Sequence, residues 1–264
     1  MTADPASEVK QCCARLYESD IVSLLLGDSF HPGGVALTER LGHLMNLTRD
    51  SHVVDVASGR GTSALHLARR FGCRVSGFDL SQPNVDRATA DAARLGLTDR
   101  VRFQRGDAEC LPLGDGSVDA VICECAFCTF PDKPQAACEF ARVLRQGGRV
   151  GLSDITRASE RSDELNDLMA WIACVADARS TETYAGFLAD AGLTISVVES
   201  HDDVVGELVR SIGARLLATD VLAALKKIDL PGVDLEAARR MTHQARIAVE
   251  KGQIGYAIVS AVRL

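Results

Sequence analysis

Apolar residues recur along the chain with two different spacings. Residues 7–30 carry them every three or four positions, and residues 35–47 repeat that spacing after a loop-like break at 30–34 that contains Pro32, Gly33 and Gly34. Such spacing places apolar side chains on one face of a helix. The start of the chain therefore predicts two helices.

Short apolar runs separated by helical segments follow from residue 52 onward. The runs predict strands over residues 52–56, 74–79, 101–104, 118–123 and 149–153. Helices are expected over residues 62–71, from about Pro83 to Leu95, and over 134–144, with a stop at Gly147-Gly148. Strands and helices that alternate in this way are typical of a parallel, doubly wound α/β sheet with helices on both faces.

The regular alternation of predicted strands and helices ends after residue 154. A helical segment is expected over 160–191, a strand over 194–199, further helix over 203–250 with a break at Pro231-Gly232, and a closing strand over 255–262. We therefore expect three parts: an N-terminal helical lid over 1–48, an α/β core over 49–202, and a helical substrate-cover insertion with the last strand of the core over 203–264.

Composition narrows the classes of protein to consider. The 264 residues are 47% hydrophobic and carry a formal net charge of -7, which gives no electrostatic reason to bind nucleic acid or an anionic membrane. Apolar stretches fall short of the roughly 18 residues that span a bilayer, and the first residues lack signal-peptide features. A cytoplasmic location is expected. The nine cysteines would then stay reduced.

The loop after the first predicted strand contains two closely spaced glycines. Residues 59–64 fit the G-x-G-x-x-A form of the dinucleotide fingerprint, which alone is a weak signal. Asp55 lies four residues before Gly59, where a carboxylate would repel a pyrophosphate at the next helix N-terminus. Asp55 instead suits a ligand that carries an ammonium and a sulfonium group.

Three further acids follow the other predicted strands: Asp79, Asp107 and Glu124. The carboxyl ends of parallel strands share one edge of a doubly wound sheet, so the four acids should line one crevice. Such a crevice favours a cationic nucleoside. The alternative is that each acid caps a helix or lies in a solvated turn.

Four segments together resemble the class I S-adenosylmethionine-dependent methyltransferases: 54–61, 77–81, 106–112 and 142–148. The resemblance implies a seven-stranded, mostly parallel Rossmann-like sheet whose last strand, 255–262, runs antiparallel. It also implies S-adenosyl-L-methionine as cofactor, with Asp79 at the ribose and Asp107-Ala108 at the adenine. The family usually has its first glycine where this chain has Ala57. The residues expected to bind cofactor are Asp55, Ala57, Ser58, Gly59, Gly61, Asp79, Leu80, Asp107, Ala108 and Glu124.

Several cysteines resemble those of the arsenite methyltransferases. That family has a cysteine after the fourth strand, matched here by Cys125 or Cys128, and a Trp-x-x-Cys segment, matched by Cys174. Cys12 or Cys13 would match an N-terminal cysteine. A second N-terminal cysteine has no counterpart, and the cysteine-rich tail of many relatives is absent.

The resemblance implies an As(III) centre held by thiolates, with Cys125 or Cys128 and Cys174 as its ligands and Cys12 or Cys13 as a further candidate. A soft trivalent centre prefers thiolates, and its lone pair can attack a methyl group without a general base. The alternative for each cysteine is a small core residue, which we expect for Cys73, Cys110, Cys123 and Cys138. A structural zinc site is weakly indicated, because Cys125-x-x-Cys128 has no second ligand pair downstream.

An organic acceptor of the methyl group is the main alternative to arsenite. A quinone, phenol or natural product with an oxygen or nitrogen nucleophile would usually need a base, and His31 is the nearest candidate, ahead of His201 and His243. His31 could also close over the methionine end of the cofactor or lie in a simple turn. A metalloid could also bind as a thiol conjugate. Two alternatives from other classes of protein are an NAD-dependent oxidoreductase and a non-catalytic metalloid-binding module.

Overall fold

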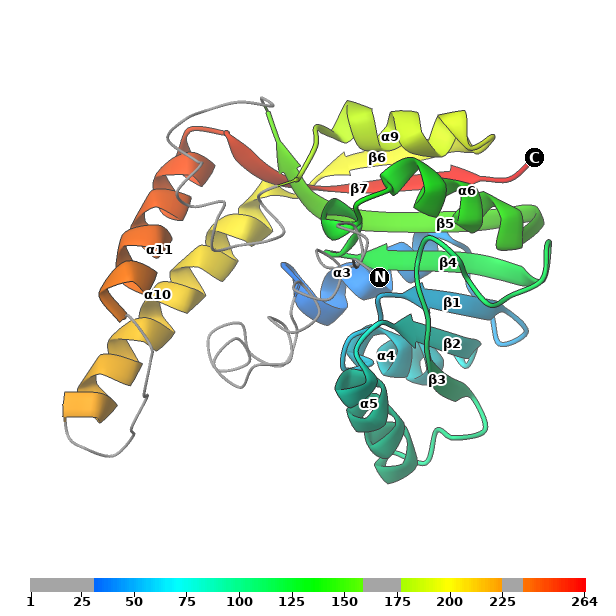
Figure 1. The fold of residues 1–264 in the computed structure, drawn as a ribbon, viewed down its shortest axis with the longest axis horizontal. Helices are drawn as coiled ribbons and strands as arrows, with labels where there is room; N and C mark the ends of the chain where they lie inside the picture. Colours follow the sequence, from blue (N-terminus) through cyan, green and yellow to red (C-terminus); the bar gives the residue numbers. More distant parts are fainter. Residues whose placement is uncertain (1–30, 159–176, 225–234) are drawn as a thin grey trace, which may run out of the picture.

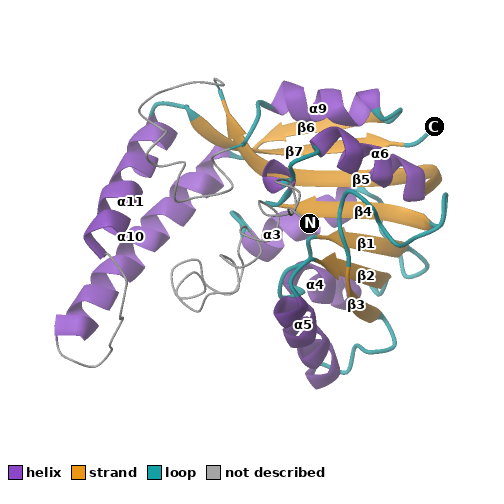
Figure 2. Cartoon of the chain, viewed as in Figure 1, coloured by secondary structure: helices purple, strands orange, loops and turns teal. Residues whose placement is uncertain are grey.

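A computed structural model describes residues 31–158, 177–224 and 235–264. Seven strands form one sheet in the order β3-β2-β1-β4-β5-β7-β6 (Figures 1 and 2). The strands are β1 His52–Val56, β2 Arg74–Asp79, β3 Val101–Arg105, β4 Val118–Glu124, β5 Leu144–Arg157, β6 Thr194–Ser200 and β7 Ile254–Val262. The first five strands pair in parallel, and β7 runs antiparallel to both β5 and β6. The predicted fold class is confirmed.

Helices cover both faces of this sheet (Figure 1). Helix α3 packs on α4 and reaches β5 and β7, whereas α6 packs on α9. Helices α10 and α11 pair as a hairpin that extends away from the sheet (Figure 2). Their bounds are α3 Gly34–Leu44, α4 Thr62–Phe71, α5 Gln82–Arg94, α6 Lys133–Val143, α9 Thr181–Asp190, α10 Asp202–Ala224 and α11 Leu235–Glu250, with a 3-10 turn, η1, at Phe127–Thr129.

Local sequence explains where several helices begin. The Ser81 hydroxyl accepts a hydrogen bond from the Asn84 backbone N–H, and the Asp132 carboxylate accepts one from Gln135. Each helix also has proline in its first turn, where no backbone donor is lost. Helix α5 therefore starts shortly after β2 ends at Asp79, whereas η1 lies between the end of β4 at Glu124 and the start of α6 at Lys133.

The central strands form the core. Val53 and Val54 in β1 are fully buried, as are Ala120, Val121 and Ile122 in β4. Continuous apolar runs of this kind are expected where helices cover both faces of a parallel sheet. β6 at the sheet edge instead alternates between partly buried and exposed residues. The hydrophobic core therefore holds the ends of β1 and β4 in fixed positions.

Two predicted boundaries are wrong. The second helix ends at Leu44, earlier than the expected residue 47. The fifth strand begins at Leu144, because it pairs with Val118 and continues through Gly147 and Gly148, where a helix stop was expected. The predicted helix over 7–30 lies outside the described residues, and of the one over 160–191 only Thr181–Asp190 is described as helical. The three-part division of the chain stays a prediction.

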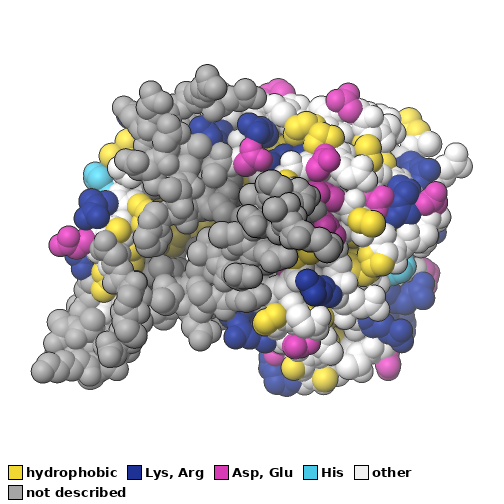
Figure 3. All heavy atoms as spheres, in the orientation of Figure 1, with side chains coloured by type: hydrophobic (Ala, Val, Ile, Leu, Met, Phe, Trp, Pro, Cys, Tyr) yellow, Lys and Arg dark blue, Asp and Glu magenta, His cyan; other side chains and the backbone are white. Residues whose placement is uncertain are grey.

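Two surface properties bear on the sequence expectations. On the face shown in Figure 3, basic and acidic side chains are interspersed, and the described residues gather into no extended basic surface. Among the helices that the structure describes, none has the length and apolar character needed to cross a membrane.

Candidate active site

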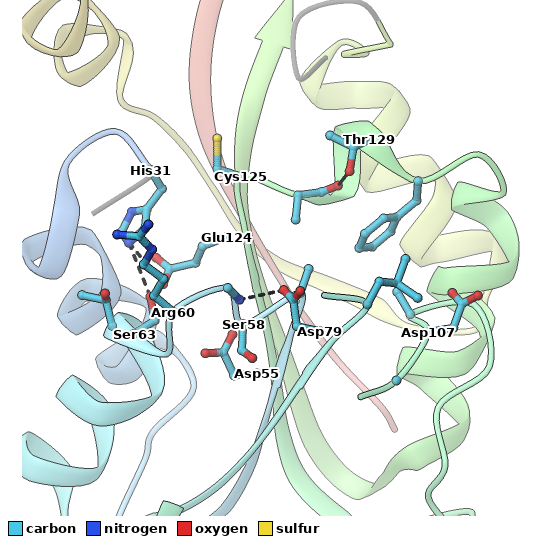
Figure 4. Close-up of a pocket in the computed structure, with 18 residues that line it drawn as sticks. His31, Asp55, Ser58, Arg60, Ser63, Asp79, Asp107, Glu124, Cys125 and Thr129 are labelled. Carbon is cyan, nitrogen blue, oxygen red and sulfur yellow. Dashed lines mark hydrogen bonds and ion pairs between the residues drawn. The ribbon is translucent and has the colours of Figure 1, made fainter. Parts of the chain in front are cut away.

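A pocket of about 150 Å³ opens at the carboxyl edge of the parallel strands. Residues from the ends of β1, β2 and β4 line it, together with loop residues after β3 (Figure 4). All but one of the residues predicted to bind cofactor lie in its wall, namely Asp55, Ala57, Ser58, Gly59, Asp79, Leu80, Asp107, Ala108 and Glu124. The exception is Gly61. The expected clustering of the four acids is therefore confirmed, while their roles toward a ligand stay predictions.

The loop between β1 and α4 has left-handed backbone at three positions. The φ angles are 56° at Ala57, 51° at Gly59 and 79° at Gly61. A Cβ on Gly61 would lie 2.4 Å from the Phe103 ring, so this glycine is needed for packing between α4 and β3. Ala57 adopts a conformation that glycine adopts at lower cost, which explains why glycine is usual at that position in the family resembled.

Asp79 holds this loop against the end of β2. One carboxylate oxygen accepts a hydrogen bond from the Gly59 N–H at 2.8 Å, and the other accepts one from the Ser81 N–H at 2.8 Å (Figure 4). The Asp79 carboxylate therefore connects the loop that follows β1 with the end of β2. Its position in the pocket wall allows a further acceptor role toward ligand hydroxyls.

Asp55 is a buried carboxyl in an acidic environment. It is 3% exposed, and its Oδ2 atom has no hydrogen-bond partner among the described residues. Burial, together with the nearby charges of Glu124 and Asp79, raises the pKa of Asp55 well above its usual range. A cation in the pocket would favour the ionised form, so the site is electrostatically suited to a positively charged ligand.

Glu124 and His31 meet at one end of the pocket. The Thr38 hydroxyl in α3 donates to the Glu124 carboxylate, at 3.0 and 3.2 Å from its two oxygens. The His31 Nε2 atom lies 3.8 Å from Glu124 Oε2 and 3.4 Å from the Ser63 hydroxyl (Figure 4). His31 is buried in the pocket wall, so its ring does not lie in an exposed turn.

The cysteines after β4 have different environments. Cys125 lines the pocket, and its backbone has a φ of 51°, directly after the last residue of β4. This left-handed residue follows the end of the strand, so the alternation of side chains along β4 does not extend to Cys125. Cys128 in η1 is fully buried in the hydrophobic core, and its N–H donates to Asp154 at 2.9 Å. Cys128 therefore lies in the core and not in the described pocket wall, and the role predicted for it as a ligand stays a prediction.

The other described cysteines are of two kinds, buried and exposed. Cys73 and Cys123 are buried as predicted, but Cys110 and Cys138 are exposed, which corrects the core assignment made for them. Cys138 lies on the outer side of α6, opposite the buried Ala136, Ala137 and Phe140. The predicted ligands Cys12, Cys13 and Cys174 lie outside the described residues. Within the parts that the structure describes, no group of three His, Cys, Asp or Glu side chains is arranged to hold a metal ion.

Sequence reasoning missed several residues of the pocket. Thr129 and Phe130 lie at the 3-10 turn after β4, which has no recognisable signal in the sequence. Thr38 reaches Glu124 across 86 positions of sequence. Arg60 was identifiable in principle, because it stands between the two glycines of the loop.

Comparison with known proteins identifies the family. A family model described as "Methyltransferase domain" matches residues 54–152. The methyltransferase GfsG of Streptomyces halstedii is 31% identical over 238 residues, covering 89% of this chain and 82% of that protein. The chain belongs to the class I S-adenosylmethionine-dependent methyltransferases. Its cofactor is S-adenosyl-L-methionine, and the predicted resemblance is confirmed at this level.

Other relatives of this methyltransferase differ in name and coverage. The O-methyltransferase cnsE of Penicillium expansum is 26% identical, covering 99% of the chain and 95% of that protein. An arsenite methyltransferase of Halobacterium salinarum is 29% identical over 154 residues, 57% of the chain and 39% of that protein. A solved geranyl diphosphate C-methyltransferase of Streptomyces coelicolor with S-adenosyl-L-homocysteine shares the fold, with a TM-score of 0.79, 20% identity and coverage of 99% and 100%. Proteins named for different acceptors therefore resemble this chain.

Proposed function

We infer that this methyltransferase transfers the methyl group of S-adenosyl-L-methionine to a nucleophilic oxygen or nitrogen of a small organic molecule. The observation that carries this proposal is the wall of the pocket beyond Glu124. It consists of Cys125, Ala126, Thr129 and Phe130, so the described part of the wall offers one thiol and a largely apolar surface. Relatives that match nearly the whole chain include a protein named as an O-methyltransferase, which supports the same inference.

The cofactor occupies the acid-lined part of the same pocket in this proposal. Asp79 is placed to accept hydrogen bonds from the ribose hydroxyls, and Asp107 and Ala108 lie where the adenine would bind. Asp55 and Glu124 supply negative charge for the ammonium and sulfonium groups. The fit rests on an observed property of the site, since the unpartnered Oδ2 atom of Asp55 is buried and requires a donor or a cation.

His31 is the residue proposed to accept the acceptor's proton. When bound, the cofactor supplies an electrophilic methyl group on a sulfonium, and an acceptor hydroxyl becomes a better nucleophile as its proton leaves. His31 Nε2 lies within reach of Ser63 and Glu124, which orient the ring toward the pocket. His31 Nε2 would accept the proton of the acceptor hydroxyl as the bound cofactor supplied its methyl group, which would leave S-adenosyl-L-homocysteine as the other product.

A radiolabelled methyl donor with phenolic, quinol and metalloid acceptors tests this proposal. We expect methylation of an organic acceptor, and a loss of about 10²- to 10⁴-fold in kcat for His31→Gln, the range typical of a general base. Affinity for S-adenosyl-L-homocysteine should stay close to that of the unaltered protein. His43→Gln is the matched control, because His43 is an exposed histidine on α3 outside the pocket wall. Unchanged turnover in His31→Gln would remove the base from the proposal.

Arsenite is the second candidate acceptor, and the position of Cys125 in the pocket favours it. A thiolate there could hold a soft trivalent centre beside the methyl donor, with Cys174 as the second proposed ligand. In this case Cys125→Ser and Cys174→Ser would each abolish arsenite methylation without weakening cofactor binding. Turnover of arsenite that survives both substitutions would exclude Cys125 and Cys174 as its ligands, and no turnover of arsenite by the unaltered protein would exclude this candidate.

A further inference from the structure

Arg60 is the one lysine or arginine among the described residues of the pocket wall. It follows Gly59 and precedes Gly61, both with left-handed backbone, and the hydrogen bonds of that loop hold it at the start of α4. The Arg60 Nε atom is inaccessible to solvent. The loop therefore directs a guanidinium group into a pocket whose other charged side chains are acids or His31.

The charged residues are unevenly placed within the pocket. Figure 4 shows Arg60 at the same end as His31, Ser63 and Glu124, whereas Asp79 and Asp107 lie toward the other end. Among the described residues, a positive and a negative side chain thus occur together at the His31 end alone. Both charges that a zwitterionic group needs are present at that end.

The cofactor of this family carries such a group at its methionine end. Its α-ammonium suits Asp55 and Glu124, but its α-carboxylate would be repelled by the four acids that line the pocket. Burying a carboxylate without a cationic partner is costly, whereas a guanidinium binds carboxylates with strong, directional hydrogen bonds.

We propose that Arg60 binds the α-carboxylate of S-adenosyl-L-methionine and so determines specificity for a cofactor with an intact amino-acid end. This rests on the family to which the chain belongs and is independent of the acceptor. It assigns a function to the one residue of segment 59–61 that is not required for the backbone turn. Binding by Arg60 also explains why a pocket lined by four acids can hold a ligand with a carboxylate.

Calorimetric titration with two ligands tests the proposal. The ligands are S-adenosyl-L-homocysteine and its decarboxylated analogue, S-adenosyl-3-thiopropylamine. Arg60→Met should weaken binding of the first by about 10- to 100-fold, the range expected for a charge-assisted hydrogen bond. Binding of the analogue should stay the same, because it lacks the group that Arg60 contacts. Arg60→Lys should recover part of the loss.

The matched control is Arg69→Met, an exposed arginine in the last turn of the same helix. It should bind both ligands as the unaltered protein does. Equal losses for the two ligands in Arg60→Met would overturn the proposal, as would no loss at all. A raised KM for an anionic acceptor with unchanged S-adenosyl-L-homocysteine affinity would assign Arg60 to the acceptor instead.

Folding of the variants does not limit the test. Thermal unfolding of each variant without ligand shows whether it folds, and Arg60→Lys keeps the charge if Arg60→Met does not fold. The unaltered protein supplies an independent outcome. If it binds the decarboxylated analogue as tightly as S-adenosyl-L-homocysteine, contacts to the carboxylate do not contribute to affinity and the proposal is wrong.

Discussion

The parallel and antiparallel halves of the sheet build the pocket in different ways. In the parallel half, β1, β2 and β4 are short strands, and the residues at their ends supply the acids directly. In the other half, β5 pairs with β7 continuously from Arg149 to Arg157, beyond Ser153, the residue that pairs with the end of β4. The first half places charged residues at strand ends that line the pocket. In the second half no described residue of β5, β6 or β7 lies in the pocket wall, and β5 supports that wall by packing against η1.

Aromatic residues pack behind the pocket wall, around Phe127. Phe127 is fully buried, and its ring makes edge-on contacts with Phe130 and Tyr184, each at 5.7 Å between centroids. Burial and the nearby Asp154 and Cys128 raise the pKa of Tyr184 far above its usual range, so its hydroxyl stays protonated and donates to the Ile155 carbonyl at 3.1 Å. The comparison teaches that the acids at the strand ends depend on local motifs, whereas the packing around Phe127 depends on contacts between residues far apart in the sequence.

The largest effect should come from removing the centre of the aromatic packing. Phe127→Ala should lower the free energy of unfolding by about 3–5 kcal/mol, as expected for a buried phenylalanine. Urea denaturation measures this value. Val198→Ala on the edge strand, where the side chain is 52% exposed, should change it by less than about 0.5 kcal/mol. A loss below 1 kcal/mol for Phe127→Ala would contradict the packing role.

The next effect concerns the acid that joins β1 and β2. Asp79→Ala removes the acceptor of the Gly59 and Ser81 N–H groups and the proposed partner of the ribose. Affinity for S-adenosyl-L-homocysteine should fall about 100-fold by calorimetry, the size expected from lost hydrogen bonds to a charged group. Asp86→Ala, an acid on the exposed side of α5, should leave the affinity unchanged. Comparable losses in both variants would argue against a specific role for Asp79.

A smaller effect should appear as a dependence on pH. Because the pKa of Asp55 is raised, the folded ligand-free protein holds a proton that the unfolded chain releases above about pH 4. The free energy of unfolding attributable to Asp55 therefore falls as pH increases from that point. Asp55→Asn should raise Tm by about 2–4 °C at pH 8, for a gain of roughly 1 kcal/mol.

The Tm difference between Asp55→Asn and the unaltered protein should shrink toward pH 4, where both side chains are neutral. Asp86→Asn, an exposed variant, serves as the reference at each pH. A difference that grows toward acid pH would have the wrong sign and would mean that Asp55 is ionised in the ligand-free fold.

The smallest effect tests the left-handed turn. Ala57→Gly relieves the cost of a left-handed alanine, about 1–2 kcal/mol, and adds flexibility to the unfolded chain that costs up to about 1 kcal/mol. A net gain in stability of about 0.5 kcal/mol is expected by urea denaturation. Ala90→Gly, at an exposed position within α5, should instead cost about 1 kcal/mol. Equal losses at the two positions would show that Ala57 carries no strain.

Local patterns could predict the acid-lined part of the pocket because each acid lies within a few residues of a strand end. The positions of Asp55 and Asp79 followed from the predicted strands and from the rule that the carboxyl ends of parallel strands share an edge. The contact between Thr38 and Glu124 could not be predicted, since it depends on how α3 packs across the sheet. Cys128 points into the core because a 3-10 turn follows β4, whereas the exposure of Cys138 could have been found from the buried positions of α6.

The hairpin of α10 and α11 has one more consequence. The hairpin follows the end of β6 at Ser200 and precedes the start of β7 at Ile254. Because Ser200 pairs with Ala257, the two ends of the hairpin lie on adjacent strands. Closing a long loop between fixed neighbouring points depends only weakly on loop length. Changes in the length of this hairpin should therefore cost the rest of the fold little, provided that Val205, Val209, Ala245 and Ala248, which belong to the hydrophobic core, are kept. Such changes make it a suitable place for grafting experiments.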